Sequence, residues 1–266
     1  MLYFIIPFRS KNSSRDFTKV CLLLERTLAS VCNQTCAEYR VLVICHERPD
    51  GIADHPRVEY VSVPFEPPPV SVLDLPREER LFAMRSDKGR KLIRGLEIAR
   101  RDASDYVMFV DADDLVSRSI AQLCEGVGHP NGWLIDRGYR MDETTPWIAY
   151  RRRRFNHECG SSHILRTAKA PFPEKPDYSL DFDDHYIRGY DLHAYVGKNM
   201  ENSGSPLAIC PFYGAVYYFN DQAIFSKDCR RKDGLVRIIM RAMVKGRLVT
   251  SSFRNEFGIE NTRPFN

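Results

Sequence analysis

The sequence lacks any long hydrophobic run, and this limits how the chain can meet a membrane. The apolar N-terminal stretch MLYFII ends at Pro7, and polar residues follow it. It is too short for a signal peptide or a transmembrane helix, and no other stretch approaches the roughly 18 apolar residues that a span needs. We therefore expect a chain that is either soluble or attached to a membrane surface.

Paired cysteines and a strong net charge are also missing. The eight cysteines include no CxxC pair, which argues against a cysteine-based zinc site. Several of them lie in apolar surroundings, where cysteine behaves as a small hydrophobic residue. We expect free thiols in a reducing compartment such as the cytoplasm. The net charge of +4 is too small to indicate nucleic acid binding, so no nucleic acid partner is expected.

Basic residues are concentrated in two places. Four arginines occupy positions 151–154, and RRK at 230–232 precedes residues 233–245, whose apolar and basic residues fall on different faces of a helix. Such clusters suit phosphates, an anionic glycan or an anionic membrane surface, but a solvated basic surface is their commoner explanation. If the partner is a membrane, the protein is expected at its inner, cytoplasmic face.

The first half of the chain predicts an α/β fold. Short β-prone runs at 2–6, 41–45, 58–63 and 106–110 alternate with helical spacing at 17–32 and 87–101, and a proline-rich loop is expected at 65–76. This order predicts a mostly parallel, doubly wound sheet. In such sheets, ligands bind beyond the carboxyl ends of the strands.

The second half is less regular and predicts a smaller, mixed extension. Strands are expected at 133–137 and 147–151 and within 208–219, helices at 184–194 and 233–245, and a loop at 168–184. The tail after residue 251 carries no strong signal.

Polar motifs directly follow three of the predicted strands, namely PFRS, CHER and DADD. We expect them to converge on one crevice. The last motif contains Asp111, Asp113 and Asp114. Mg²⁺ is usually held by one or two carboxylates together with substrate phosphates, so this cluster suits a cation–diphosphate site. The alternative is that Asp113 or Asp114 caps a helix that begins near residues 117–119.

Taken together, FIIPFRSK, SVCNQT, VLVICHERPD and DKGRKLIRGLEIARRDASDYVMFVDADD resemble the GT-A glycosyltransferases, particularly the family 2 group. The resemblance covers about residues 1–117. It implies a GT-A fold, which is a Rossmann-like αβα sandwich, with a nucleotide-sugar-binding subdomain at 1–117. Residues 118–266 would form the acceptor-binding half of the same domain.

The same resemblance implies a reaction. A sugar would move from a nucleotide-diphosphate donor, with UDP favoured, to a hydroxyl of a glycan or lipid-linked glycan, with inversion and with the help of Mn²⁺ or Mg²⁺. The implied nucleotide-binding residues are Pro7, Phe8, Arg9, Glu47, Asp87, Lys88, Lys91, Asp111 and Ala112. Asp113 would be the main metal ligand and Asp111 the second.

One motif departs from the family pattern. The family has Asp-Asp-Gly-Ser after the second strand, whereas this chain has Cys45, His46, Glu47 and Arg48. We expect Glu47 to accept the base N–H in place of the missing aspartate. For Lys88 and Lys91, a solvated helix face remains the alternative.

The general base is expected in the second half. Asp183 and Asp184 form a carboxylate pair, and the resemblance assigns Asp184 as the base, with Asp183 second. Either residue could instead cap a helix. The stretch 159–162 resembles the family's acceptor-side loop, and Asn220 is a weaker candidate at the diphosphate.

Two other functions remain open. A sugar nucleotidyltransferase shares a similar sheet, but it would usually carry a glycine-rich loop after its first strand, and PFRSKNSS contains no glycine. A non-catalytic nucleotide- or glycan-binding relative would be expected to lose the DxD motif or the carboxylate pair, and this chain keeps both.

Overall fold

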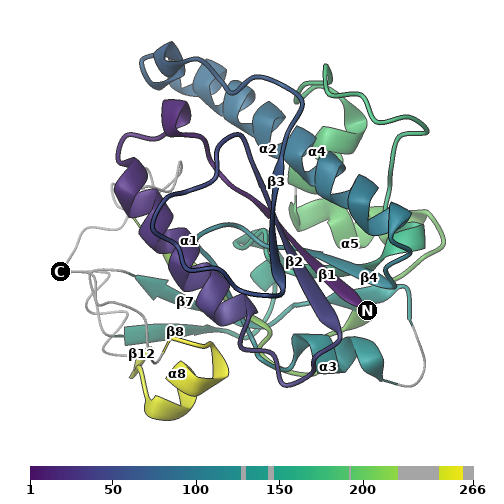
Figure 1. The fold of residues 1–266 in the computed structure, drawn as a ribbon. Helices are drawn as coiled ribbons and strands as arrows, with labels where there is room; N and C mark the ends of the chain where they lie inside the picture. The colour runs from purple at the N-terminus through teal and green to yellow at the C-terminus, as the bar shows by residue number, and fades with distance from the viewer. Residues whose placement is uncertain (127–129, 143–146, 192, 221–245, 260–266) are drawn as a thin grey trace.

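A computed structural model describes residues 1–126, 130–142, 147–191, 193–220 and 246–259 (Figure 1). The basic cluster at 230–232 and the helix expected at 233–245 lie outside these residues. The described part contains a central sheet with helices on both faces and a second, smaller sheet. The predicted α/β class is confirmed.

The central sheet has the strand order β10-β6-β9-β4-β1-β2-β3. Its strands are β1 Leu2–Pro7, β2 Tyr39–Cys45, β3 Val58–Ser62, β4 Tyr106–Phe109, β6 Gly132–Leu134, β9 His163–Arg166 and β10 Ala208–Ile209. Within it, β9 is antiparallel to its neighbours β4 and β6, and the other described pairs are parallel. The prediction of a mostly parallel sheet is therefore correct.

Helices α1 (Phe17–Val31) and α2 (Arg77–Arg101) cover opposite faces of this sheet (Figure 1). Even-numbered side chains of β1, such as Phe4, pack in the cluster that contains α1, and odd-numbered ones, such as Ile5, pack with α2. This follows from the alternation of side chains along a strand. At Gly95 of α2, a Cβ would lie 2.3 Å from Ile5 Cγ2, so the helix packs directly on β1.

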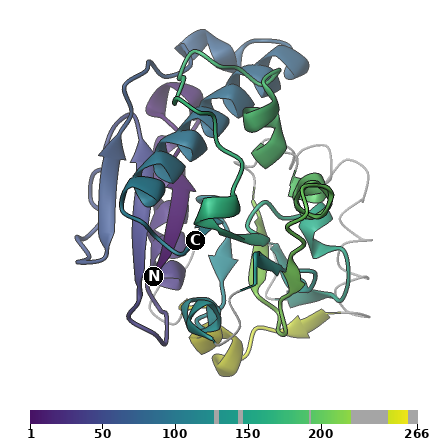
Figure 2. The same ribbon diagram turned by 90° about the vertical axis from the view of Figure 1, so that its right-hand side faces the viewer.

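The second sheet has the order β12-β8-β7-β11-β5. Its strands are β5 Leu115–Val116, β7 Gly138–Asp142, β8 Trp147–Arg151, β11 Ala215–Phe219 and β12 Gly246–Leu248. Strand β5 precedes residue 117, whereas β6, β9 and β10 of the central sheet follow it. Residues 1–117 and 118–266 therefore contribute to both sheets. Figure 2 shows the N-terminal strands on one side and most of the green and yellow C-terminal elements on the other.

The remaining helices complete the two layers. They are α3 Ile120–Glu125, α4 His185–Asp191, α5 His193–Asn202 and α8 Ser251–Glu256, with 3-10 turns η1 Lys11–Ser13, η2 Val70–Leu73, η3 Phe155–His157 and η4 Thr167–Lys169. Helix α8, which the sequence did not signal, packs Phe253 against the second sheet, together with Phe257 directly after the helix. None of the helices in the described ranges is both long and apolar enough to cross a membrane.

Several boundaries differ from the prediction. The segment expected as one helix at 184–194 contains α4 and the start of α5, and the strand expected at 133–137 is β6. Helix α2 begins at Arg77 rather than at Asp87, because Glu78 and Glu79 in its first turn suit the positive end of the helix dipole. Leu81 and Met84 of the same segment are buried, which also favours the earlier start. In the expected loop at 65–76, residues 70–73 form the turn η2.

Candidate functional site

A cavity of about 230 Å³ lies beyond the carboxyl ends of β1 and β4. Three parts of the chain supply most of the residues that the sequence singled out. They are Pro7, Phe8 and Arg9 at and just beyond the end of β1, Asp87, Lys88 and Lys91 on α2, and Asp111, Ala112 and Asp113 after β4. The structure thus brings together every predicted nucleotide or metal residue except Glu47.

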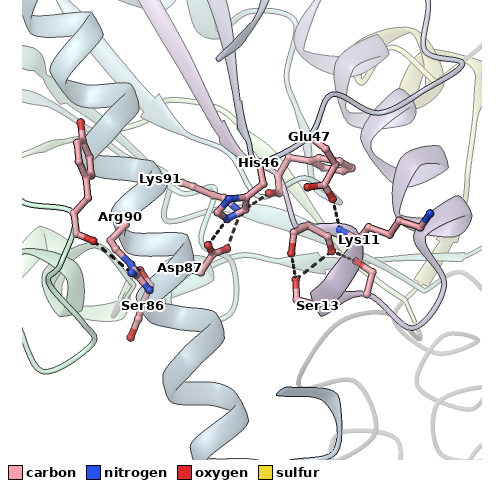
Figure 3. Close-up of polar contacts among 12 residues, drawn as sticks. Lys11, Ser13, His46, Glu47, Ser86, Asp87, Arg90 and Lys91 are labelled. Carbon is pink, nitrogen blue, oxygen red and sulfur yellow. Dashed lines mark hydrogen bonds and ion pairs between the residues drawn. The ribbon is translucent and has the colours of Figure 1, made fainter. Parts of the chain in front are cut away.

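Glu47 lies outside the cavity lining. Its carboxylate accepts a hydrogen bond from the backbone N–H of Lys11 (Figure 3). The neighbouring residue His46 instead turns inward and contacts Asp87 of the lining. The sequence reasoning missed His46, although its place directly after β2 was a usable signal.

The two carboxylates predicted as the general base, Asp183 and Asp184, also lie outside the cavity lining. Asp184 Oδ1 accepts hydrogen bonds from the N–H groups of Tyr186 and Ile187, so it caps α4. Asp183, whose side chain is 75% exposed, pairs with Arg188 at 2.8 Å. The helix-cap reading is confirmed for Asp184. The catalytic role of either residue stays a prediction.

Asp111 and Asp113 present two carboxylates to the cavity. Lys88 Nζ lies 2.6 Å from Asp111 Oδ1, and Asn220 Nδ2 donates to Asp113 Oδ2 at 2.8 Å. Burial raises the pKa of Asp113, and the charge of Asp111 raises it further. A carboxylate in this position is stabilised by any cation that binds beside it.

Asp114 turns away from the cavity and is buried. Its carboxylate accepts from Ser161 Oγ at 2.7 Å, from the Tyr218 N–H at 3.2 Å and from Cys159 Sγ at 3.2 Å. Burial and the charges of the two preceding aspartates raise its pKa well above the usual range. Asp114 therefore joins the acidic motif to the loop before β9 and to β11.

The alternative that Asp113 or Asp114 caps the next helix is wrong. Strand β5 follows Asp114 directly, and α3 begins only at Ile120, with Ser119 at its N-cap position. The Asp113 carboxylate thus points to the cavity and the Asp114 carboxylate to the core, and neither of the two caps α3.

The SVCNQT signature holds the chain that follows the acidic motif. Ser30 Oγ accepts from the Val116 N–H at 2.9 Å and lies 3.1 Å from the Val116 carbonyl oxygen. Gln34 donates to the Ser117 carbonyl oxygen and accepts from the Ala121 N–H. These contacts fix the position of the acidic motif relative to α1. The SVCNQT signature is therefore structural, and none of its residues lines the cavity.

Asp87 and Lys91 of the cavity lining belong to a buried ionic cluster with His46, whose side chains Figure 3 shows together. Asp87 Oδ2 pairs with Lys91 Nζ at 2.6 Å, and Asp87 Oδ1 lies 2.7 Å from His46 Nε2. Lys91 also donates to the Phe8 carbonyl oxygen at 2.8 Å. Burial alone would raise the pKa of Asp87, but the charge of Lys91 and the hydrogen bond from His46 lower it overall. The alternative of a solvated helix face is wrong for Lys91, whose side chain is 1% exposed.

The cavity also has a wall from the second half of the chain, formed by Glu158, Gly160, His193 and Tyr217. Glu158 Oε2 accepts from Arg151 Nε at 2.9 Å. The ring of His193 is bound through Nδ1 to the carbonyl oxygen of a neighbouring 3-10 turn, η3. The sequence reasoning assigned no role to Glu158, because no local pattern marks it.

The donor set of the cavity suits a hard divalent cation that is completed by a ligand. Two carboxylates, Asp111 and Asp113, are the oxygen donors that Mg²⁺ and Mn²⁺ accept together with phosphates. Within the described residues, no group of three or more His, Cys, Asp or Glu side chains is placed to hold a metal. A cation here would therefore need further oxygen ligands, such as those of a diphosphate.

If the cavity binds the nucleotide and cation that the sequence resemblance implies, we expect Gly160→Ala to weaken that binding without unfolding the protein. An added Cβ would lie 2.6 Å from Asp111 Oδ2, so the carboxylate would have to leave its position beside Lys88. A displaced Asp111 carboxylate should then lower the affinity for UDP with Mn²⁺ by about tenfold or more, as measured by calorimetry. The matched control is Gly197→Ala on α5, whose Cβ would meet only Leu134 atoms at 3.6 Å and 3.8 Å. Equal affinities for the two variants would contradict the prediction.

Comparison with known proteins gives no family. No family model matches the chain, and no curated protein matches it. Among solved structures, S. aureus TarS 1–349 aligns with a TM-score of 0.42 and 13% identity, covering 82% of this chain and 60% of that one. The same protein in complex with UDP-GlcNAc aligns with a TM-score of 0.43 and 14% identity, over 85% of this chain and 60% of that one.

A third structure is 2-C-methyl-D-erythritol 4-phosphate cytidylyltransferase from Francisella tularensis. It aligns with a TM-score of 0.40 and 13% identity, over 87% of this chain and 97% of that one. This chain thus spans 60% of the length of the TarS structures that it matches. With TM-scores this low, these likenesses carry no weight in assigning a function.

Proposed function

We propose that this protein is a metal-dependent GT-A glycosyltransferase. It transfers a sugar from a nucleotide-diphosphate donor, with UDP favoured, to a hydroxyl of a glycan or lipid-linked glycan acceptor, with inversion. The observation that supports this most is the cavity itself. Acidic and basic side chains that follow β1, lie on α2 or follow β4 line the same space.

The charge arrangement supports a diphosphate as the ligand. Arg9, Arg85 and Lys88 bring positive charge to the lining beside the two aspartates. Burial lowers the pKa of Arg9, while the charges of the surrounding aspartates raise it. An anionic group beside these cations would regain some of the stabilisation that burial removes. A nucleoside diphosphate with a bound cation supplies both the negative and the positive partners.

Asp113 and Asp111 would hold Mn²⁺ or Mg²⁺, with Asp113 as the main ligand. A bound divalent cation would neutralise charge on the departing diphosphate. Pro7, Phe8 and Arg9 would line the nucleotide pocket. Lys88, now paired with Asp111, would turn to a phosphate oxygen once the cation takes its place. Asn220 would fix the orientation of Asp113.

The proposed reaction takes place in the cytoplasm. All described cysteines are free thiols, which fits a reducing compartment. The exposed arginines 152–154 would face an anionic glycan or the inner surface of a membrane. For the general base, the sequence resemblance offers Asp184 and then Asp183.

Calorimetry with UDP, GDP and CMP, each with and without Mn²⁺, tests the proposal. UDP binding that requires Mn²⁺ is the expected result. Nucleotide binding that is equally strong without Mn²⁺, or no binding of any nucleotide, would refute the proposed function. Product analysis with a set of UDP-sugars would then separate transfer from hydrolysis. If CMP binds in preference to UDP, a nucleotidyltransferase becomes the better reading.

A further inference from the structure

We infer that Glu158 is the general base of the proposed transferase. The inference rests on the proposed function and adds to it the residue that takes the proton from the acceptor hydroxyl. It begins from the ionisable side chains that line the cavity. Among the carboxylates there, Asp111 and Asp113 are assigned to the metal, and Asp87 and Glu158 remain.

Asp87 cannot easily accept a proton from a substrate. Its Oδ1 contacts His46 and its Oδ2 pairs with Lys91, so both carboxylate oxygens are occupied. Its side chain is only 6% exposed. Glu158 differs on both points. Its side chain is 34% exposed, and Oε2 accepts from Arg151 while Oε1 has no hydrogen-bond partner within the described residues.

The backbone places Glu158 beside the acidic motif. Strand β9 pairs antiparallel with β4, so the residues that precede β9 meet those that follow β4. Ser161 Oγ accepts from the Asp111 N–H at 2.8 Å, and Gly160 approaches the Asp111 carboxylate closely enough that a Cβ would clash. Glu158 lies two residues before Gly160, and both residues line the cavity.

The turn that carries Glu158 is held firmly. Its N–H donates to the Phe155 carbonyl oxygen at 2.9 Å, and Phe155 is fully buried. The Phe155 ring lies 2.5 Å from the position of a Cβ on Gly138, so the turn packs directly on β7. Arg151 of β8 holds one carboxylate oxygen from the side. A base on a fixed turn, with one oxygen held and the other available, is suited to proton transfer.

The step balances as follows. The acceptor oxygen forms a bond to the anomeric carbon, and the bond from that carbon to the diphosphate oxygen breaks. The electron pair of the broken bond leaves with the nucleoside diphosphate. The proton of the acceptor hydroxyl moves to Glu158 Oε1 and later passes to solvent. When water replaces the acceptor, the same step is donor hydrolysis, which allows a test without a known acceptor.

The test measures UDP release from a set of UDP-sugars in Mn²⁺ buffer, together with UDP affinity by calorimetry, for wild type and variants. We expect Glu158→Gln to lower kcat by about 100- to 10,000-fold while the UDP affinity stays within about twofold of wild type. Glu158→Asp should retain intermediate activity. The matched control is Glu201→Gln on the exposed side of α5, which should leave kcat unchanged.

The rival bases are measured in the same assay. Asp184→Asn keeps a side chain that can cap α4, so the fold should tolerate it. A collapse of kcat in Asp184→Asn or His193→Gln, with Glu158→Gln active, would overturn the assignment while leaving the transferase intact. Wild-type protein that binds UDP but releases none from any donor would also overturn it. Failure of UDP binding itself would instead refute the proposed function.

Discussion

Replacing Asp113 with asparagine is expected to abolish metal-dependent UDP binding while making the unliganded protein more stable. Asp113 Oδ2 accepts a hydrogen bond from the buried Asn220 side chain, and asparagine at position 113 keeps nearly the same shape without the charge. Because Asp113 is the proposed main metal ligand, its loss should weaken UDP binding in the presence of Mn²⁺ by more than about 100-fold, as measured by calorimetry.

The stability change has the opposite sign, for an electrostatic reason. Burial and the charge of Asp111 raise the pKa of Asp113, so the ionised form costs stability in the folded state at neutral pH. Removing the charge should therefore raise the free energy of unfolding measured in urea without metal. The control is Asp50→Asn in an exposed loop, which should change neither quantity. A variant that binds UDP as wild type does would show that the carboxylate is not a metal ligand.

The first half of the site was predictable because parallel strands end at one edge of their sheet. Pro7 at the end of β1 and Asp111 after β4 lie at the same edge of the sheet for this reason, since β1 and β4 are neighbours. A motif that directly follows a buried strand is thus placed by the strand alone. Both the strand and the motif that follows it can be recognised from a short local stretch of sequence.

The other wall of the cavity depends on a pairing that no local pattern shows. Glu158 and Gly160 reach the site only because β9 inserts antiparallel beside β4. Such a pairing joins residues about fifty positions apart, as in the 2.8 Å contact between Asp111 and Ser161. The burial of Asp87 and Lys91 likewise could not be predicted from their spacing. An i,i+4 pair on a helix is normally a surface feature, whereas this pair is buried beside His46, which directly follows β2.

The role of Asp184 could not be predicted for a different reason, because the same sequence pattern is compatible with two roles. An acidic pair before a helix can be a base or a cap, and the two uses need the same residue type. Only the hydrogen bonds to the N–H groups of Tyr186 and Ile187 reveal the cap.

Replacing Lys91 with methionine is expected to destabilise the protein severely. The ammonium is almost fully buried, and its removal would leave the Asp87 carboxylate with His46 alone. Breaking a buried ion pair from one side costs about 3 to 5 kcal/mol. Urea denaturation at pH 7 should show this loss. The double variant Asp87→Asn with Lys91→Met should recover part of it, because no unpaired charge remains.

The same helix offers a matched control for Lys91→Met. Arg94 pairs with Glu97 at 2.5 Å, but both side chains are partly exposed, at 27% and 34%, so Arg94→Met should cost about 1 kcal/mol or less. The pH dependence provides a second check. Because the folded pKa of Asp87 is lowered, the stability that its charge contributes is present above the unfolded pKa and is lost as the pH falls through the folded value. The difference between wild type and Lys91→Met should therefore shrink below about pH 4. A penalty that stays constant from pH 7 to pH 3 would show that Lys91 stabilises the fold by packing and not by its charge.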